Sequence, residues 1–316
     1  MDNRWERKKI RREVGSYGWA LVIYYVMMNV SVVAFAFLGV AFQMLAKISR
    51  GEFAEVDASE MASNGWGYLA ACLLAVLFIR LWKGKEFFSG IWKNEETMGG
   101  RTFFRLLCLM VSGQLLFQFC APIQEAMLNL LGLSVMESME LAMVQTDTIS
   151  MFLYMSLGAP VVEEIIFRGL ILRGLERFGK GYAVLISSIL FGLFHGNIIQ
   201  SPYAFAVGLV LGYTAVKYNI VWAMVLHMVN NLILGDTIPR LTGWMGEIGS
   251  GLVIQIIIWI CGVVSLVALF RNRKRLGAYT LPGNENWNGW WAFCTAPGVI
   301  VMFLLMQFNA WTMLLL

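Results

Sequence analysis

The sequence predicts an all-α protein that crosses a membrane repeatedly, with about eight to nine transmembrane helices. Apolar segments of about 20 residues recur along the chain, which is the length a helix needs to cross a bilayer. Hydrophobic residues make up 59% of the 316 residues and charged residues only 14%, a composition typical of polytopic membrane proteins. Basic and acidic loops alternate between the apolar segments, and this is a separate indication of the same fold class.

Nine apolar segments are candidate membrane spans. They cover residues 18–46, 65–83, 103–121, 148–172, 181–199, 203–218, 219–235, 250–270 and 289–313. The first is longer than the apolar region of a cleavable signal peptide, so we expect it to remain as a helix. The shorter segments are expected to tilt or to lie partly in the interface.

The charge of the loops predicts the orientation of the chain. The N-terminal stretch RWERKKIRR is basic, whereas the following loop, RGEFAEVDASE, carries four carboxylates. Lysine and arginine return within residues 83–101, are missing from 121–150 and return at 173–180. Because basic loops stay in the cytoplasm, we expect a cytoplasmic N-terminus. The net charge of +4 therefore indicates topology, and no nucleic-acid partner is expected.

The fourth apolar segment contains the stretch GAPVVEEIIFRGL, residues 158–170, with three adjacent charges. A charge at mid-bilayer costs roughly 2.5–3.5 kcal/mol on insertion scales, so such residues usually serve a function. Glu164 and Arg168 are four apart and share a helix face, where Arg168 can neutralise Glu164. Glu163 points about 100° away and is therefore not committed to the pair of Glu164 with Arg168. Pro160 is expected to bend the helix and open space near the carboxylates.

The alternative is that this helix ends at Gly158 and that the glutamates begin a cytoplasmic loop. The apolar stretch IIFRGLILRGL, which continues past the charges, argues against this alternative.

Two later segments carry the only two histidines of the chain. In FGLFHGN, Phe191 and His195 are one helical turn apart, and in LHMVNN, His227 and Asn231 share a face. Each histidine alone would more often be a packing residue. Both are expected in mid-span near the glutamates, so that imidazoles, carboxylates, an arginine and an amide can converge. A buried chamber of this kind can supply the base, water and oxyanion donors of a hydrolysis.

Small residues at four-residue spacing predict close packing between these segments. They are Ser188, Gly192 and Gly196 in one segment and Ala204, Gly208 and Gly212 in the next. The five cysteines are scattered and predict neither a disulfide framework nor a cysteine metal site.

The three polar elements, in this order, resemble the family of CAAX prenyl endopeptidases and bacteriocin-processing enzymes, also called the CPBP or Abi intramembrane protease family. The family pattern E-E-x-x-x-R, F-x-x-x-H, H-x-x-x-N is matched at every position by Glu163-Glu164-Arg168, Phe191-His195 and His227-Asn231. The resemblance makes residues 145–236 the catalytic core. It divides the rest into a basic cytoplasmic head, 1–17, N-terminal helices, 18–144, and C-terminal helices, 237–316.

The resemblance implies a role for each motif residue. Glu163 with His195 would activate the attacking water, while His227 and Asn231 would stabilise the oxyanion. Glu164 and Arg168 would hold the site in place, and Phe191 would contact the substrate.

Whether a metal is needed stays open at this point, because both metal-dependent and metal-free mechanisms have been argued for the family. Glu163, His195 and His227 could ligate zinc and leave the other glutamate as base. The sequence lacks the H-E-x-x-H helix, which favours a site without cofactor, with zinc as the alternative.

The predicted function is that of an intramembrane endopeptidase in a membrane, most simply a prokaryotic plasma membrane. Its partners would be the lipid bilayer and a membrane-associated peptide or protein, of the CAAX or the leader and bacteriocin type. One alternative is a non-proteolytic membrane scaffold or bacteriocin self-immunity protein. The other is a proton-coupled transporter, for which the paired broken helices of inverted repeats are missing.

Overall fold

The computed structural model describes residues 3–51, 64–92, 96–134, 148–276 and 287–315, which are helices joined by turns, without a strand among them. The fold is therefore the predicted all-α, polytopic membrane fold. Five described segments are long and apolar enough to cross a membrane, and six if one bent pair counts as a span. The sequence prediction of eight to nine spans is larger, because two predicted segments lie within one helical segment, Ile220–Asn272, and the helix Lys180–Phe194 is too short for this criterion.

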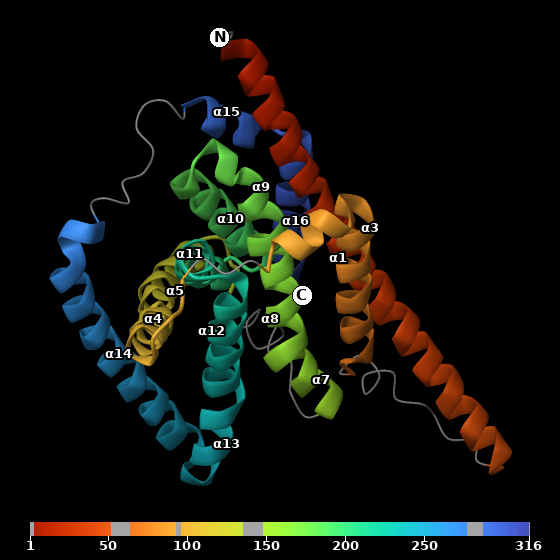
Figure 1. Ribbon diagram of the computed structural model, residues 1–316. Helices are drawn as coiled ribbons and strands as arrows, with labels where there is room; N and C mark the ends of the chain where they lie inside the picture. The colour runs from red at the N-terminus through yellow and green to blue at the C-terminus, as the bar shows by residue number, and fades with distance from the viewer. Residues whose placement is uncertain (1–2, 52–63, 93–95, 135–147, 277–286, 316) are drawn as a thin grey trace.

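The longest helix is α1 (Asn3–Ser49), which runs diagonally past the rest of the molecule in Figure 1. Residues 3–17 of the predicted basic head form the first turns of this helix. Forty-seven residues of α-helix extend about 70 Å, more than twice the thickness of the hydrocarbon core. Helix α3 (Trp66–Gly90) lies against α1, where the backbone of Gly67 approaches that of Val32 closely.

The fourth apolar segment is one continuous helical rod of alternating type, shown in yellow-green at the centre of Figure 1. It consists of α7 (Ile149–Leu153), the π-helix η1 (Tyr154–Gly158), α8 (Ala159–Glu164), the π-helix η2 (Ile165–Leu172), α9 (Arg173–Leu175) and the 3₁₀ turn η3 (Glu176–Phe178).

A proline explains the first π-helix. Pro160 has no N–H to bond the carbonyl of Ser156, and in η1 the N–H of Ala159 bonds the carbonyl of Tyr154, five residues back. The helix therefore continues through the charged residues, and the alternative in which it ends at Gly158 is wrong.

Three further helices complete the centre of the molecule: α10 (Lys180–Phe194), α11 (Gln200–Lys217) and α12 (Ile220–Leu232). The predicted small-residue contacts are confirmed between α10 and α11. A Cβ added to Gly208 would lie 3.0 Å from Ser188, and one added to Gly192 would lie 2.9 Å from the carbonyl oxygen of Ser201. Gly196 lies beyond the end of α10 with φ 58°, so it ends the helix instead of extending the ridge.

The remaining elements surround this centre. They are helix α4 (Gly100–Ser112), α5 (Gln114–Asn129), the π-helix η4 (Ile233–Thr237), α13 (Ile238–Thr242), the 3₁₀ turn η5 (Gly243–Met245), α14 (Gly246–Leu276), α15 (Trp287–Thr295) and α16 (Pro297–Leu315). Of these, α4, α5 and α16 contact the helices of the centre. Helix α14 packs mainly on α4, whereas α15 and α16 pack on α1. The last two helices bend by 56° at the start of α16.

Candidate intramembrane active site

The predicted site residues come from three neighbouring parts of the fold. Glu163 and Glu164 end α8, and Arg168 lies in η2. Helix α12 packs directly on α8 and carries His227 and Asn231, as the positions of the two helices in Figure 1 illustrate. The convergence that the sequence predicts for the glutamates and His227 is confirmed by these contacts.

Glu164 is the centre of the buried polar cluster. Its Oε1 accepts a hydrogen bond from Arg168 Nη1 at 2.9 Å and lies 3.0 Å from His227 Nδ1. Arg168 also donates from Nη2 to the carbonyl of Gly208 at 3.1 Å, which ties the pair to α11. Both side chains are fully buried. The predicted Glu164–Arg168 pair is confirmed, and its carboxylate holds the His227 ring by the nitrogen Nδ1.

Glu163 has a more open environment. Its Oε2 lies 3.8 Å from His227 Nε2, longer than a hydrogen bond, and its side chain is 18% exposed. The sequence prediction that Glu163 is the less committed carboxylate agrees with this geometry. The two ring nitrogens of His227 thus face the two glutamates, Nδ1 towards Glu164 and Nε2 towards Glu163.

His195 differs from the sequence expectation. It is the C-cap of the 15-residue α10 rather than a mid-span residue, because Gly196 ends the helix there. Its Nδ1 lies 2.8 Å from the carbonyl oxygen of Phe191. Among the described residues, no ion pair or hydrogen bond joins His195 to Glu163, whose nearest imidazole contact is with His227, so the joint activation of a water by Glu163 and His195 stays a prediction.

Phe191 connects the two imidazoles. Its ring centroid lies 4.8 Å from that of His195 and 5.8 Å from that of His227, edge to face, with the Arg168 guanidinium 4.6 Å away. Phe191 is buried and packs against both histidine rings, while its predicted contact with substrate stays a prediction.

Asn231 lies one turn beyond His227, at the side of α12 that faces η1. Its Nδ2 donates to the carbonyl of Met155 at 3.2 Å. The neighbouring Asn230 donates to Asn231 Oδ1 at 3.3 Å and contacts the hydroxyl of Tyr203. Sequence reasoning missed Asn230, although the doubled NN in an apolar helix was a signal for it.

Residues 145–233 match the family model of the type II CAAX prenyl endopeptidase Rce1-like proteins. The matched range contains every motif residue and is consistent with the CPBP resemblance. Comparison with curated proteins and with solved structures gives no match. The family that this model describes is one of prenyl endopeptidases, and the region of this chain that is similar to it, called the Rce1-like region below, is residues 145–233.

The walls around the Rce1-like residues include side chains from outside the matched range. Tyr24 of α1 and Cys72 of α3, together with Tyr154 of η1 from within that range, are near enough to Glu163 to interact with it electrostatically. The Tyr24 ring stacks on Phe194 with centroids 5.5 Å apart. Sequence reasoning missed these residues, since none of them belongs to a family motif.

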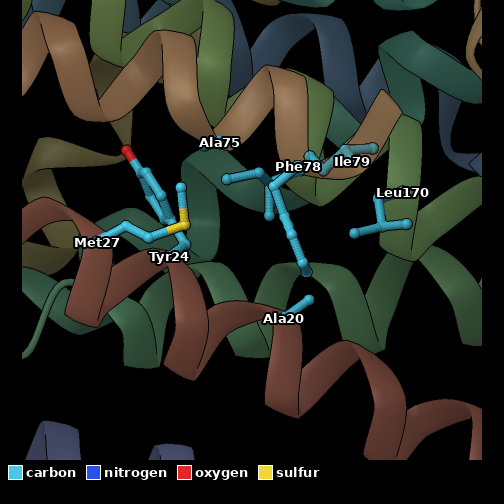
Figure 2. A pocket seen from close by; sticks show the side chains of 8 residues that line it. Ala20, Tyr24, Met27, Ala75, Phe78, Ile79 and Leu170 are labelled. Carbon is cyan, nitrogen blue, oxygen red and sulfur yellow. The ribbon is translucent and has the colours of Figure 1, made fainter. Parts of the chain in front are cut away.

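The same two N-terminal helices form an apolar floor beside the site. Figure 2 shows Tyr24 and Met27 of α1 facing Ala75 and Phe78 of α3, with Leu170 of η2 nearby. These side chains line a cavity of about 10 Å³, room for about one water molecule. The lining is apolar, so this side of the chamber keeps solvent away from the buried ion pair.

The zinc alternative can be tested on the donor atoms. Glu163 and His227 are close, and the Nδ1 atoms of His227 and His195 face Glu164 and a backbone carbonyl, which leaves both Nε2 atoms open as in histidines that ligate a metal. Within the described part of the chain, no three His, Cys, Asp or Glu side chains are grouped as metal ligands. The orientation of the two histidines fits a metal, the three side chains are not grouped around one point, and the zinc alternative therefore stays a prediction.

Proposed function

We propose that the protein is an intramembrane endopeptidase that hydrolyses a peptide bond in a membrane-associated peptide or protein tail. The observation that supports this most strongly is the position of His227 between two unlike carboxylates. One, Glu164, is buried and paired with Arg168, and the other, Glu163, is partly open. The two carboxylates can therefore have different functions. Glu164 can position His227, whereas Glu163 can exchange a proton.

In the proposed reaction, Glu163 removes a proton from a water molecule. The water oxygen attacks the carbonyl carbon of the scissile bond, and the carbonyl oxygen becomes an oxyanion. The tetrahedral intermediate then breaks its C–N bond, and Glu163 returns the proton to the departing nitrogen. The atoms and charges of these steps balance without a bound metal or cofactor.

The remaining residues stabilise this sequence of steps. His227, with Nδ1–H donating to Glu164, presents Nε2 to the space beside Glu163. That nitrogen and Asn231 Nδ2 are the proposed oxyanion donors, and His195 is proposed to orient the water. Glu164 and Arg168 form an ion pair without net charge, which reduces the cost of burying them beside His227.

The substrate is proposed to be a CAAX-type tail or a leader or bacteriocin-type peptide. Exposed apolar residues at the Asn231 side of the site, Met155 and Leu157, favour a substrate that arrives within the lipid. We further propose a prokaryotic plasma membrane and a cytoplasmic N-terminus, which the basic residues at the start of α1 support.

The test compares cells that produce the wild-type protein, Glu163→Gln, or Glu86→Gln. Glu86 is an exposed glutamate at the end of α3 and serves as the matched control. New peptide N-termini in the membrane proteome, mapped by mass spectrometry, are expected with the wild type and the control and not with Glu163→Gln. The same new N-termini in cells with Glu163→Gln would show that the protein acts without this base, as a scaffold or immunity protein would.

A further inference from the structure

A second hollow lies at the opposite end of α1 from its acidic loop, outside the Rce1-like region. It has a volume of about 460 Å³ and is lined by Lys8, Arg11, Arg12, Gly15, Ser16, Trp19 and Pro297. The α1 residues follow one another at spacings of three and four, so they lie on one face of the helix. The opposite wall is the bend between α15 and α16, where Pro297 begins the last helix.

The shape of this hollow follows from how tightly the two helices meet below it. The backbones of Gly18 and Gly298 are so close that a Cβ on either glycine would overlap the other helix. Above this contact, the bend at Pro297 carries α15 away from the straight line of α16, and α1 stays straight. The hollow lies beside this contact, between the basic face of α1 and Pro297 at the start of α16.

The charge of the hollow is of one sign. Three cations line it, and no carboxylate is among the described lining residues. Arg11 is held in place, because its Nε donates to the carbonyl of Thr295 at 3.0 Å and its guanidinium lies 5.8 Å from the centre of the Trp291 ring. Lys8 and Arg12 are exposed and form no ion pair within the part of the chain that the structure describes.

The nearest acidic residue of α1 in this turn does not neutralise the hollow. Glu13 forms an ion pair with Arg177 and accepts a hydrogen bond from Tyr17, both towards the other side of the helix. The three cations are thus left to attract an anion from outside the protein.

The other end of the hollow is apolar. Trp19 is half exposed at its lower edge, and below it the exposed side chains of Ile23, Ile300 and Leu304 continue along α1 and α16. A ligand that fills the hollow would therefore carry an anionic group at one end and a hydrocarbon chain at the other. The residues of the hollow also indicate a position at the membrane surface, since tryptophan and lysine or arginine gather where a helix leaves the membrane.

We propose that this hollow is a binding site for an anionic phospholipid, with the headgroup phosphate between Lys8, Arg11 and Arg12 and an acyl chain along Trp19. Scattered basic residues on a cytoplasmic face attract anionic membranes without a defined site. This hollow differs because one cation is fixed by two contacts and all three open onto one volume. The inference does not depend on the proposed proteolysis.

The experiment uses the full-length protein in a neutral detergent, with native mass spectrometry to count bound lipids. The probes are short-chain phosphatidylglycerol, phosphatidylcholine of the same chain length, and inorganic phosphate. One phosphatidylglycerol is expected to stay bound where phosphatidylcholine does not, and inorganic phosphate is expected not to displace it at equal concentration. Equal retention of the two lipids would overturn the proposal, and displacement by phosphate would assign the site to a free anion instead of a lipid.

Variants locate the binding. Lys8→Gln with Arg12→Gln is expected to weaken phosphatidylglycerol binding about 30-fold, since each basic residue near a membrane surface contributes about fivefold. The matched control is Lys85→Gln with Arg101→Gln, which removes two exposed cations elsewhere and changes the net charge equally. Equal weakening in the two double variants would show that binding depends on overall charge and would refute a defined site.

A steric variant keeps all three cations. Ser16→Leu adds bulk to the wall of the hollow, and the hydroxyl it removes bonds only the carbonyl of Glu13 in the same helix. Binding of phosphatidylglycerol is expected to fall at least fivefold with an unchanged elution volume and helix content. Unchanged affinity in this variant would place the lipid outside the hollow.

Discussion

Replacing Arg168 with methionine removes the cation that neutralises Glu164 in the core. Arg168 is fully buried and makes two hydrogen bonds, to Glu164 and to the carbonyl of Gly208. Removing one partner of a buried ion pair costs about 3–5 kcal/mol, because the remaining charge stays in a medium of low dielectric constant. We expect Arg168→Met to lower the free energy of unfolding by this amount and to abolish turnover.

A second substitution separates stability from activity. Glu164→Gln combined with Arg168→Met removes both charges, and the glutamine oxygen can still accept a hydrogen bond from His227. Since an uncharged pair of similar volume is often as stable as a buried ion pair, the double variant should recover most of the lost stability. Turnover should stay at least about 100-fold below wild type, because the carboxylate that stabilises a charged His227 is gone.

The assay is equilibrium unfolding in mixed detergent, followed by circular dichroism, together with cleavage of a substrate found by the proteome comparison. Lys217→Gln is the matched control, because the Lys217–Glu96 pair is exposed and should contribute only about 0.2–1 kcal/mol. Recovery of both stability and activity in the double variant would refute the assignment of Glu164 and Arg168 as positioning residues. A loss in Arg168→Met no larger than in the control would refute the energetic argument.

Three other predictions concern packing, the oxyanion and the metal. Gly208→Val should destabilise the protein by about 1–3 kcal/mol in the same unfolding assay, because its Cβ would crowd Ser188, whereas Gly235→Val has open space and should cost less; equal costs would contradict the packing argument. Asn231→Ala should lower kcat by about 100- to 1000-fold with the unfolding midpoint preserved, and an unchanged kcat would exclude Asn231 as an oxyanion donor. Elemental analysis of the pure protein should find less than one zinc per chain, and activity should survive strong chelators; inhibition by chelators with rescue by zinc would reverse the proposed metal-free mechanism.

The parts of the site that the sequence predicts well depend on spacing within one helix. Glu164 and Arg168 are four residues apart, and this local relation is sufficient to predict that they pair. The contacts of Ser188 and Gly208 are similarly predictable, since small residues at regular spacing allow two helices to approach.

The parts that the sequence does not predict depend on where helices end and on which distant helices meet. Apolar composition continues past the end of α10, so only the positive φ of Gly196 reveals that His195 is a C-cap. The approach of Tyr24 to Glu163 joins residues from α1 and α8, and no local pattern encodes such a contact. The number of spans is a related case, because hydropathy does not say where one apolar helix ends and the next begins.

The unbroken length of α1 has a mechanical consequence. Lys8 and Tyr24 are 16 residues apart on one rod, about 24 Å along its axis, with no proline or π-turn between them. A straight helix of this kind does not bend when one of its ends is displaced. Any rocking of α1 that follows the thickness or surface charge of the bilayer therefore moves the Tyr24 ring relative to Glu163 as well.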